Sequence, residues 1–202
     1  MRNELSARRN LYELASRILS REIDPPLYRA LQTAETELTD ESSGAMLISP
    51  HLEQGGEEHA LEALCVEFCR LFIGPHALCP PYESIQRGEA MLGGRAERAF
   101  THFLYRHGLQ PAVPQDLPIL ATDHLSVQLA VLSHLHDRTL RSGSTPETRH
   151  IVEELLNEHV LPWAPAYLDT IRSATDLNPY QLIAEVTAQF LRTEQSLELC
   201  TS

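Results

Sequence analysis

The stretch that decides the fold is EFCRLFIGPHALCPPYESIQ, from Glu67 to Gln86. Its first part has apolar residues at helical spacing, and Gly74 followed by Pro75 predicts that this helix ends there. Glycine accepts the left-handed conformation at a helix C-terminus, and proline cannot continue the helix. The rest of the stretch holds two more prolines, a tyrosine and a glutamate, whereas loops that only join helices are usually short. The stretch therefore predicts a stiff loop that holds a defined shape.

Helical spacing of apolar residues extends from this loop in both directions. The predicted helices cover residues 11–19, 25–38, 57–72, 88–107, 117–140, 146–160, a short segment after Pro165, and 180–192. The polar segment 39–56 and the proline-containing connector 109–116 are interpreted as loops. No stretch has the alternating pattern of a β-strand. The sequence predicts an all-α fold, a single-domain bundle or globule of about seven or more helices that spans residues 1–202.

Composition and charge exclude several classes of partner. Of the 202 residues 43% are hydrophobic and 22% charged, as in an ordinary globular protein. The net charge of -12 argues against a grip on nucleic acid, which needs a basic surface, and against an anionic membrane surface. No segment near Met1 has the apolar core of a secretory signal, and none approaches the ~20 apolar residues of a membrane helix. We therefore expect a cytoplasmic protein with no membrane insertion.

The pair Asp123-His124 stands out because it lies within the most apolar predicted helix, 117–140, whose apolar residues occupy two faces. A buried charge must be partnered or must line a cleft. The pair is thus either a hydrogen-bonded core feature or the floor of a binding groove, and the residues favour neither. Trp163, between two prolines, is interpreted as a core anchor in preference to a recognition aromatic.

Two weaker patterns concern catalysis and metal binding. His136-Asp137 has the dipeptide of the metal-dependent HD phosphohydrolases, which are also helical, but a dipeptide alone is a weak signal. Cys65 and Cys69 lie four residues apart on one helical face and are interpreted as small buried apolar side chains. No CxxC pair occurs, so we expect reduced cysteines.

Three segments, in order along the chain, resemble a known family. They are EFCRLFIGP…CPPYES from Glu67, DHLSVQLAVLSHL from Asp123 and LLNEHVLPWAPAYLDTI from Leu155. Together they are similar to the TorD-like chaperones, the redox-enzyme maturation proteins that include the DmsD and NarJ branches. One departure is Ala121-Thr122 before Asp123, where the family commonly has a proline.

The resemblance implies an all-α TorD-like fold with no catalysis and no cofactor of its own. It implies a cytoplasmic chaperone that binds the twin-arginine signal peptide, or the apo-precursor, of a molybdenum-type oxidoreductase. Such a chaperone aids cofactor insertion and delays export until folding is complete.

The resemblance also implies a peptide-binding site at the residues that match the family motif. These are Leu71, Phe72, Gly74, Pro81, Tyr82, Glu83, Ser84, Asp123 and His124. A signal peptide offers arginines and then an apolar stretch, so its site needs carboxylates and an apolar groove. We expect Glu83 and Asp123 to supply charge, and Phe72 and Tyr82 to supply apolar surface. The prolines would preorganise the loop and lower the entropy lost on binding.

Two other functions remain open from the sequence. One is an HD-type metal phosphohydrolase centred on His136. The other is a structural assembly factor that binds only the mature redox enzyme. A monomer and a helix-swapped dimer are both compatible with the two predicted loops.

Overall fold

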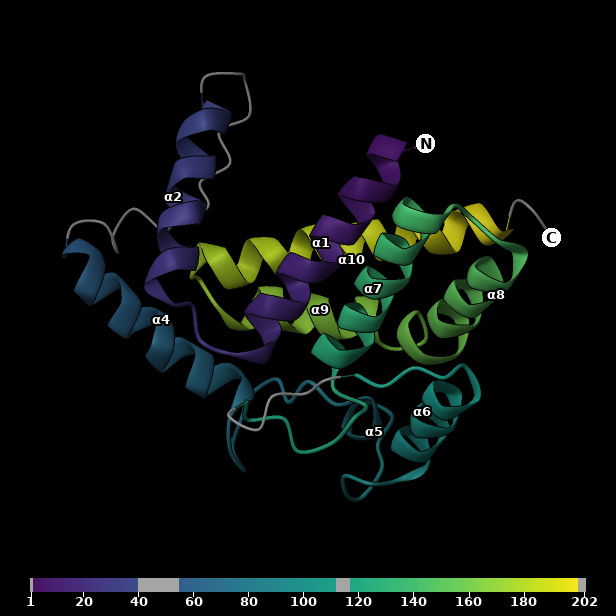
Figure 1. Cartoon of the computed structure of the whole chain (residues 1–202). Helices are drawn as coiled ribbons and strands as arrows, with labels where there is room; N and C mark the ends of the chain where they lie inside the picture. The colour runs from purple at the N-terminus through teal and green to yellow at the C-terminus, as the bar shows by residue number, and fades with distance from the viewer. Residues whose placement is uncertain (1, 40–54, 112–116, 200–202) are drawn as a thin grey trace.

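The computed structural model describes residues 2–39, 55–111 and 117–199. These ranges form helices and no named strand, as predicted (Figure 1). The elements are α1 (Arg2–Ser20), α2 (Pro25–Thr39), α4 (Gly56–Phe72), α5 (Glu83–Gln86), α6 (Arg95–Arg106), α7 (Leu125–Ser142), α8 (Pro146–Glu154), the π-helix η1 (Leu155–Val160), α9 (Ala164–Ala174) and α10 (Asn178–Leu199). Within the same ranges, no helix is both long and apolar enough to span a bilayer.

The centre of the molecule is the packing of α1 along α7 and of α9 along α10 (Figure 1). α2 and α4 lie at one end of this central group and α8 at the other. The buried apolar side chains form one connected cluster, to which α1, α2, α4, α6 to α10 and η1 all contribute. Tyr12, Phe68, Phe100 and Tyr167 are among its largest members and are almost fully inaccessible to solvent.

The C-terminus of α4 forms as the sequence predicts. The helix ends at Phe72, and Gly74 adopts a positive φ of 86°. The chain then folds back on the last turn of α4, where the Cys79 amide donates to the Leu71 carbonyl at 2.7 Å. The loop is thereby tied to the helix that precedes it, which fixes where the following prolines begin.

The prediction of a helix over 117–140 was wrong at its start. α7 begins at Leu125, and Leu120, one of the apolar residues within the predicted range, is 80% exposed and precedes the helix. Pro118 disfavours the helical conformation in the residue before it. His124 is the N-cap: its Nδ1 accepts a hydrogen bond from the Ser126 amide at 3.1 Å. Asp123 and His124 therefore precede the most apolar helix and do not interrupt it.

The helix predicted over 88–107 is also shorter than expected, because α6 begins only at Arg95. The residues before it are not helical, and Gly93 has a positive φ of 79°. The Glu89 carboxylate accepts from the amides of Arg95 and Ala96 at 2.6 and 2.9 Å and so caps the helix start. Conversely, α10 is longer than the predicted 180–192. Most of the predicted loop 39–56, and 112–116 of the connector, lie outside the described residues.

The cysteine prediction was wrong for α4. Cys69 is exposed and Cys65 only half-buried, while Cys79, in the loop, is buried. Helical spacing located both α4 cysteines on one side of the helix, but within the described part of the chain Cys69 is left exposed. The three described cysteines are free thiols.

Candidate functional site

The two motif segments meet in an isolated antiparallel β-bridge between Tyr82 and His124. The Glu83 amide donates to the Asp123 carbonyl at 3.0 Å, and the Leu125 amide donates to the Pro81 carbonyl at 2.8 Å. Segments about 40 residues apart in sequence are thus joined directly before α5 and α7 begin. We call this junction, residues 81–84 with 123–125, the hub.

Tyr82 connects the hub to residues 118–120, which precede Asp123 in the chain. Its ring packs edge-on against that of His124, with centroids 4.9 Å apart. Its hydroxyl accepts a hydrogen bond from the Leu120 amide at 3.1 Å and lies 3.5 Å from the Pro118 carbonyl, to which it donates. The hydroxyl therefore fixes residues 118–120 to the hub.

Asp123 holds the start of α5. The residue is fully buried, and its Oδ2 accepts from the Ser84 amide at 2.8 Å. Burial raises the pKa of the Asp123 carboxyl, and the hydrogen bonds from Ser84 oppose that rise. The carboxyl group thus stabilises the hub from inside and does not reach solvent.

Glu83 is the second buried carboxylate of the hub, with 2% exposure. Gln128 of α7 donates to its Oε2 at 2.7 Å, and Arg87 approaches Oε1 at 2.8 Å. His159 of η1 lies 3.6 Å from Oε2 through Nδ1. Three elements therefore converge on one carboxylate, which compensates the free energy lost when the charge leaves water.

His159 also fixes the position of Trp163. The indole N–H of Trp163 donates to the His159 carbonyl at 2.6 Å, and both residues are buried. The His159 ring packs on Phe100 and Phe103 of α6, with centroids 5.2 and 5.4 Å apart. Trp163 is a core anchor, as interpreted from the sequence, and it is hydrogen-bonded to the residue whose ring lies beside Glu83.

The remaining motif residues form the end of α4. Leu71 is fully buried, and Phe72 packs against Phe68 and Tyr180. Of the nine residues predicted for the site, Gly74 alone is exposed. The structure thus brings residues 81–84 and 123–124 together, but as an internal junction, and neither the Glu83 nor the Asp123 carboxylate is accessible.

Sequence reasoning did not identify Gln128, Arg87 or His159 as partners of Glu83. Gln128 carried a signal, because it is a polar residue within the most apolar helix and is completely buried. A buried amide needs hydrogen-bond partners. His159 lay within a quoted motif segment, but its spacing in sequence does not indicate that it faces α5.

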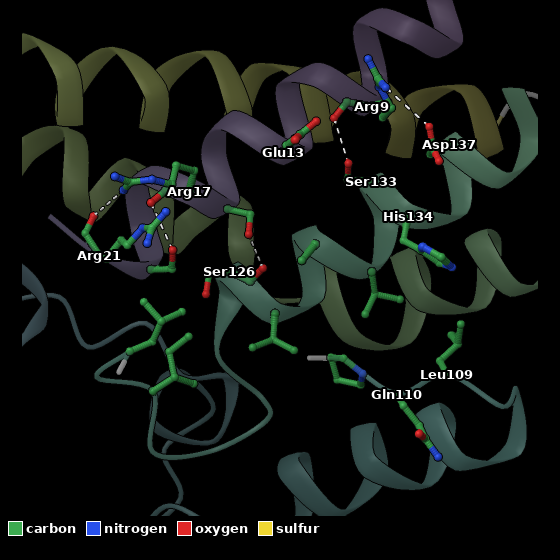
Figure 2. Close-up of a pocket in the computed structure, with 18 of the residues that line it drawn as sticks. Arg9, Glu13, Arg17, Arg21, Leu109, Gln110, Ser126, Ser133, His134 and Asp137 are labelled. Carbon is green, nitrogen blue, oxygen red and sulfur yellow. Dashed lines mark hydrogen bonds and ion pairs between the residues drawn. The ribbon is translucent and has the colours of Figure 1, made fainter. Parts of the chain in front are cut away.

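An open groove lies between α1 and α7 and is closed on one side by residues 108–111 and 117–119 (Figure 2). Its volume is about 790 Å³. Its apolar lining comes from the segment between α6 and α7 and from α7 itself. The residues are Leu109, Leu117, Ile119, Val127, Ala130 and Val131. We call it the α1–α7 groove. Since Ile119 lies between the two backbone groups that Tyr82 holds, the hub positions one wall of this groove.

The rim of the α1–α7 groove is charged and mostly basic. Four arginines and two carboxylates line it: Arg9, Arg17, Arg21, Arg141, Glu13 and Asp137. Asp137 pairs with Arg9 at 3.5 Å and with Arg141 at 2.8 Å. Figure 2 shows the first of these contacts across the top of the groove, with Glu13 on α1 beside it. The excess of arginines makes the rim a poor site for a cationic group.

A second cavity, also of about 790 Å³, lies between α5, α6, η1 and α9, and Glu83 of the hub lines it. We call it the α6–α9 cleft. Its lining includes three carboxylates (Glu83, Glu89 and Glu158) and two arginines (Arg87 and Arg95). Small exposed residues such as Ala99 and Ala166 form part of its surface, so its mouth is not blocked. Glu158 is exposed there, which provides a negative charge that a ligand can reach.

The hypothesis of an HD-type phosphohydrolase has no support in the arrangement of His136. This residue is buried and stacks on Tyr12 with ring centroids 5.7 Å apart. Burial lowers its pKa to about 4. Asp137 instead faces Arg9 and Arg141 at the groove rim. Among the described residues, neither member of the dyad belongs to a group of three potential metal ligands.

Comparisons with known proteins agree on one family of chaperone-related proteins. Residues 24–169 match the family model described as nitrate reductase delta subunit. The Tat proofreading chaperone DmsD of Salmonella typhi is 29% identical over 130 residues, which cover 63% of this chain and 58% of that protein. The chaperone protein TorD of Shewanella sp. (strain ANA-3) is 29% identical over 141 residues, which cover 64% of this chain and 66% of that protein.

The matched regions thus span less than two thirds of the length of these curated relatives. A solved structure from Archaeoglobus fulgidus, described as a redox enzyme maturation protein, aligns with a TM-score of 0.52 and 22% identity. The alignment covers 92% of this chain and 93% of that one. At this identity the match establishes a common all-α fold.

Proposed function

The chain belongs to the family described as nitrate reductase delta subunit, and on this premise we propose that it is a redox-enzyme maturation chaperone. Its ligand is the twin-arginine signal peptide, and with it the apo-precursor, of a molybdenum-type oxidoreductase. It acts in the cytoplasm, without catalysis, by retaining the precursor until cofactor insertion and folding are complete. The observation that carries the proposal is the hub, in which Tyr82 holds one wall of an apolar groove and Glu83 lines a carboxylate-containing cleft.

The apolar stretch of the peptide is assigned to the α1–α7 groove. Its lining offers aliphatic side chains along one face of α7, and a helix or extended segment can bury its own apolar side chains there. The wall at 117–119 is held by Tyr82 and therefore needs little ordering when a ligand binds. The groove rim has more arginines than carboxylates, so it does not suit the arginine pair.

The arginine pair is assigned to the α6–α9 cleft. The carboxylates of Glu89 and Glu158 line this cleft, and the buried Glu83 adds negative charge from its floor. Glu83 and Asp123 thus do not bind the peptide directly. Asp123 holds the start of α5 in place, and Glu83 contributes to the electrostatic potential in the cleft. The other motif residues, from Leu71 to Ser84 and His124, act by holding the loop that carries Tyr82 and Glu83.

The experiment is calorimetric titration with twin-arginine signal peptides of molybdenum-type oxidoreductases. Each peptide is compared with a version in which both arginines are alanine. The expected result is micromolar binding of at least one peptide and weaker binding of its alanine version. Binding of the folded mature enzyme, with no binding of any signal peptide, would contradict the proposal and favour a structural assembly factor.

Two exposed alanines provide matched variants for the two assignments. Ala130 lies on α7 in the groove, Ala99 lies on α6 in the cleft, and Ala30 on α2 lines neither cavity. Ala130→Trp should weaken binding of the signal peptide and of its alanine version by about tenfold, because the indole occupies the space that the apolar side chains of the peptide would fill. Ala99→Trp should instead reduce the preference for the arginine peptide, and Ala30→Trp should change neither. The reverse pattern would exchange the two assignments.

A charge variant tests the cleft more directly. Glu158→Gln should reduce the preference for the arginine peptide by about two- to fivefold, the range of an exposed ion pair. Glu13→Gln, at the rim of the α1–α7 groove, is the matched control and should leave that preference unchanged. If Glu13→Gln has the larger effect, the arginines bind on the α1 side.

A further inference from the structure

A cluster of potential metal-binding side chains lies on the C-terminal half of α4, beside the α1–α2 turn. Cys65 and Cys69 of α4 and Glu22 of the α1–α2 turn each direct one ligand atom to a common point. The two Sγ atoms and a carboxylate oxygen all lie within 4.8 Å of one another. Among the described residues, this is the group of three or more such side chains with that spacing.

The geometry follows from the local structure. Residues four apart on a helix lie on the same face, so α4 aligns the two thiols without any further constraint. Glu22 lies in the turn between α1 and α2, and Arg17 holds that turn by donating to the carbonyls of Arg21 and Glu22 at 3.2 and 2.9 Å. The backbone that carries the carboxylate is therefore held against the end of α1.

The cluster is accessible, and the arginine of α4 does not occupy it. Glu22 and Cys69 are exposed and Cys65 is half-buried. Arg70, the nearest arginine along α4, pairs with Glu67 at 2.6 Å and donates to the Ala174 carbonyl at 2.6 Å. It is therefore directed away from the thiols, toward α9. A cation can reach the three ligand atoms from solvent.

We propose that Cys65, Cys69 and Glu22 form a binding site for one zinc-like cation, with the fourth position open. Two sulfur ligands and one carboxylate suit Zn²⁺, which prefers four ligands in tetrahedral geometry and accepts sulfur and oxygen together. Sulfur ligands disfavour Mg²⁺ and Ca²⁺. The open position accepts water or a side chain from a bound partner. Because the ligands come from two elements, the cation would cross-link the α1–α2 turn to α4.

The test uses Co²⁺ as a spectroscopic probe on the full chain, kept reduced and freed of metal. The expected result is one Co²⁺ per chain, with thiolate-to-cobalt charge-transfer absorption and the visible bands of tetrahedral cobalt, both removed by Zn²⁺. Cys65→Ser with Cys69→Ser should abolish the charge-transfer absorption. Cys79→Ser, which changes a buried cysteine that is not a member of the cluster, should leave it intact. Charge-transfer absorption that survives the double variant, or that never appears, overturns the proposal.

The carboxylate is tested by a matched pair of substitutions. Glu22→Gln should weaken Co²⁺ binding by about tenfold or more, in the range seen when a metal site loses one supporting group. Glu62→Gln changes an exposed glutamate of α4 that is not a member of the cluster, and it should have no effect. Equal effects of the two variants would overturn the three-ligand site. Zinc should also protect both thiols of the parent from alkylation, as measured by mass spectrometry, and should protect them less in Glu22→Gln, whose helical circular dichroism is compared with that of the parent.

Discussion

Tyr82 and His124 pair through an isolated antiparallel bridge, and their rings meet edge to face 4.9 Å apart. Each also caps a neighbouring segment: the Tyr82 hydroxyl accepts from the Leu120 amide, and His124 Nδ1 accepts from the Ser126 amide. The pair therefore joins one wall of the α1–α7 groove to the first turn of the helix that forms its floor.

Removing the Tyr82 hydroxyl should loosen that wall while the ring contact remains. Tyr82→Phe leaves the Leu120 amide without its acceptor and should lower the free energy of unfolding by about 1 kcal/mol. We also expect weaker binding of the apolar stretch of the peptide. Urea denaturation and calorimetric titration measure the two effects. Tyr105→Phe, at a position 84% exposed, is the control and should change neither.

Truncating Asp123 should destabilise the hub. Asp123→Ala removes the acceptor of the buried Ser84 amide, and an unsatisfied buried donor lowers stability by about 1 to 3 kcal/mol. Asp169→Ala, which breaks an exposed ion pair with Arg192, should lower it by only about 0 to 1 kcal/mol. Urea denaturation of both variants provides the comparison. Equal losses would mean that the Asp123 carboxylate does not stabilise the hub.

Stability should fall in mild acid because two histidines are buried. Burial lowers the pKa of His124 to about 3 and that of His136 to about 4. An unfolded histidine titrates near pH ~6.5, so below that pH the unfolded state binds more protons and gains stability. The stabilisation is complete above pH ~6.5 and is lost as pH falls toward the folded pKa values, by about 1.4 kcal/mol per pH unit for each histidine.

The measurement is urea denaturation at neutral pH and in mild acid. His136→Phe retains a ring beside Tyr12 but cannot titrate, so its stability should fall less steeply with pH than that of the parent. His102→Phe changes an exposed histidine and should follow the parent's slope. A parent slope unchanged by His136→Phe would show that this residue does not contribute to the acid sensitivity.

The glycine that ends α4 should tolerate asparagine better than alanine. Gly74 has a φ of 86°, and a Cβ placed there meets no atom within 4 Å, so the penalty comes from the backbone alone. Gly74→Ala should lower the free energy of unfolding by about 1 kcal/mol, and Gly74→Asn by less, because asparagine adopts this conformation more readily. Thermal or urea unfolding of the two variants measures the difference, and an equal loss would contradict the backbone explanation.

Local chemistry in the sequence was sufficient to predict the end of α4. Gly74 and Pro75 define it through their own conformational preferences, which act without tertiary contacts. The start of α7 could not be located in this way, because apolar residues on both sides of Asp123 have helical spacing. The His124 cap and the contacts of Tyr82 with residues 118–120 favour the later start.

The candidate site could also be predicted only in part. The motif residues near Tyr82 and Asp123 were expected to act together, and they do meet in space. For Asp123 and His124 a hydrogen-bonded core position was one of the two interpretations left open. The burial of Glu83 was not foreseen, because its partners come from α7 and η1, far away in sequence. The exposure of Cys69 was missed for the opposite reason. Helical spacing shows which residues share a face, but only the packing of other elements decides whether that face is covered.

The π-helix η1 has a consequence for how relatives should be aligned. A π-helical turn holds one residue more than an α-helical turn, and each added residue rotates those that follow by about 100°. His159 faces Glu83 from within η1, and Trp163 follows it. A relative lacking one residue between 155 and 160 would direct its equivalent histidine elsewhere. A one-residue gap at this point of an alignment would therefore mark chains in which the buried glutamate has a different partner.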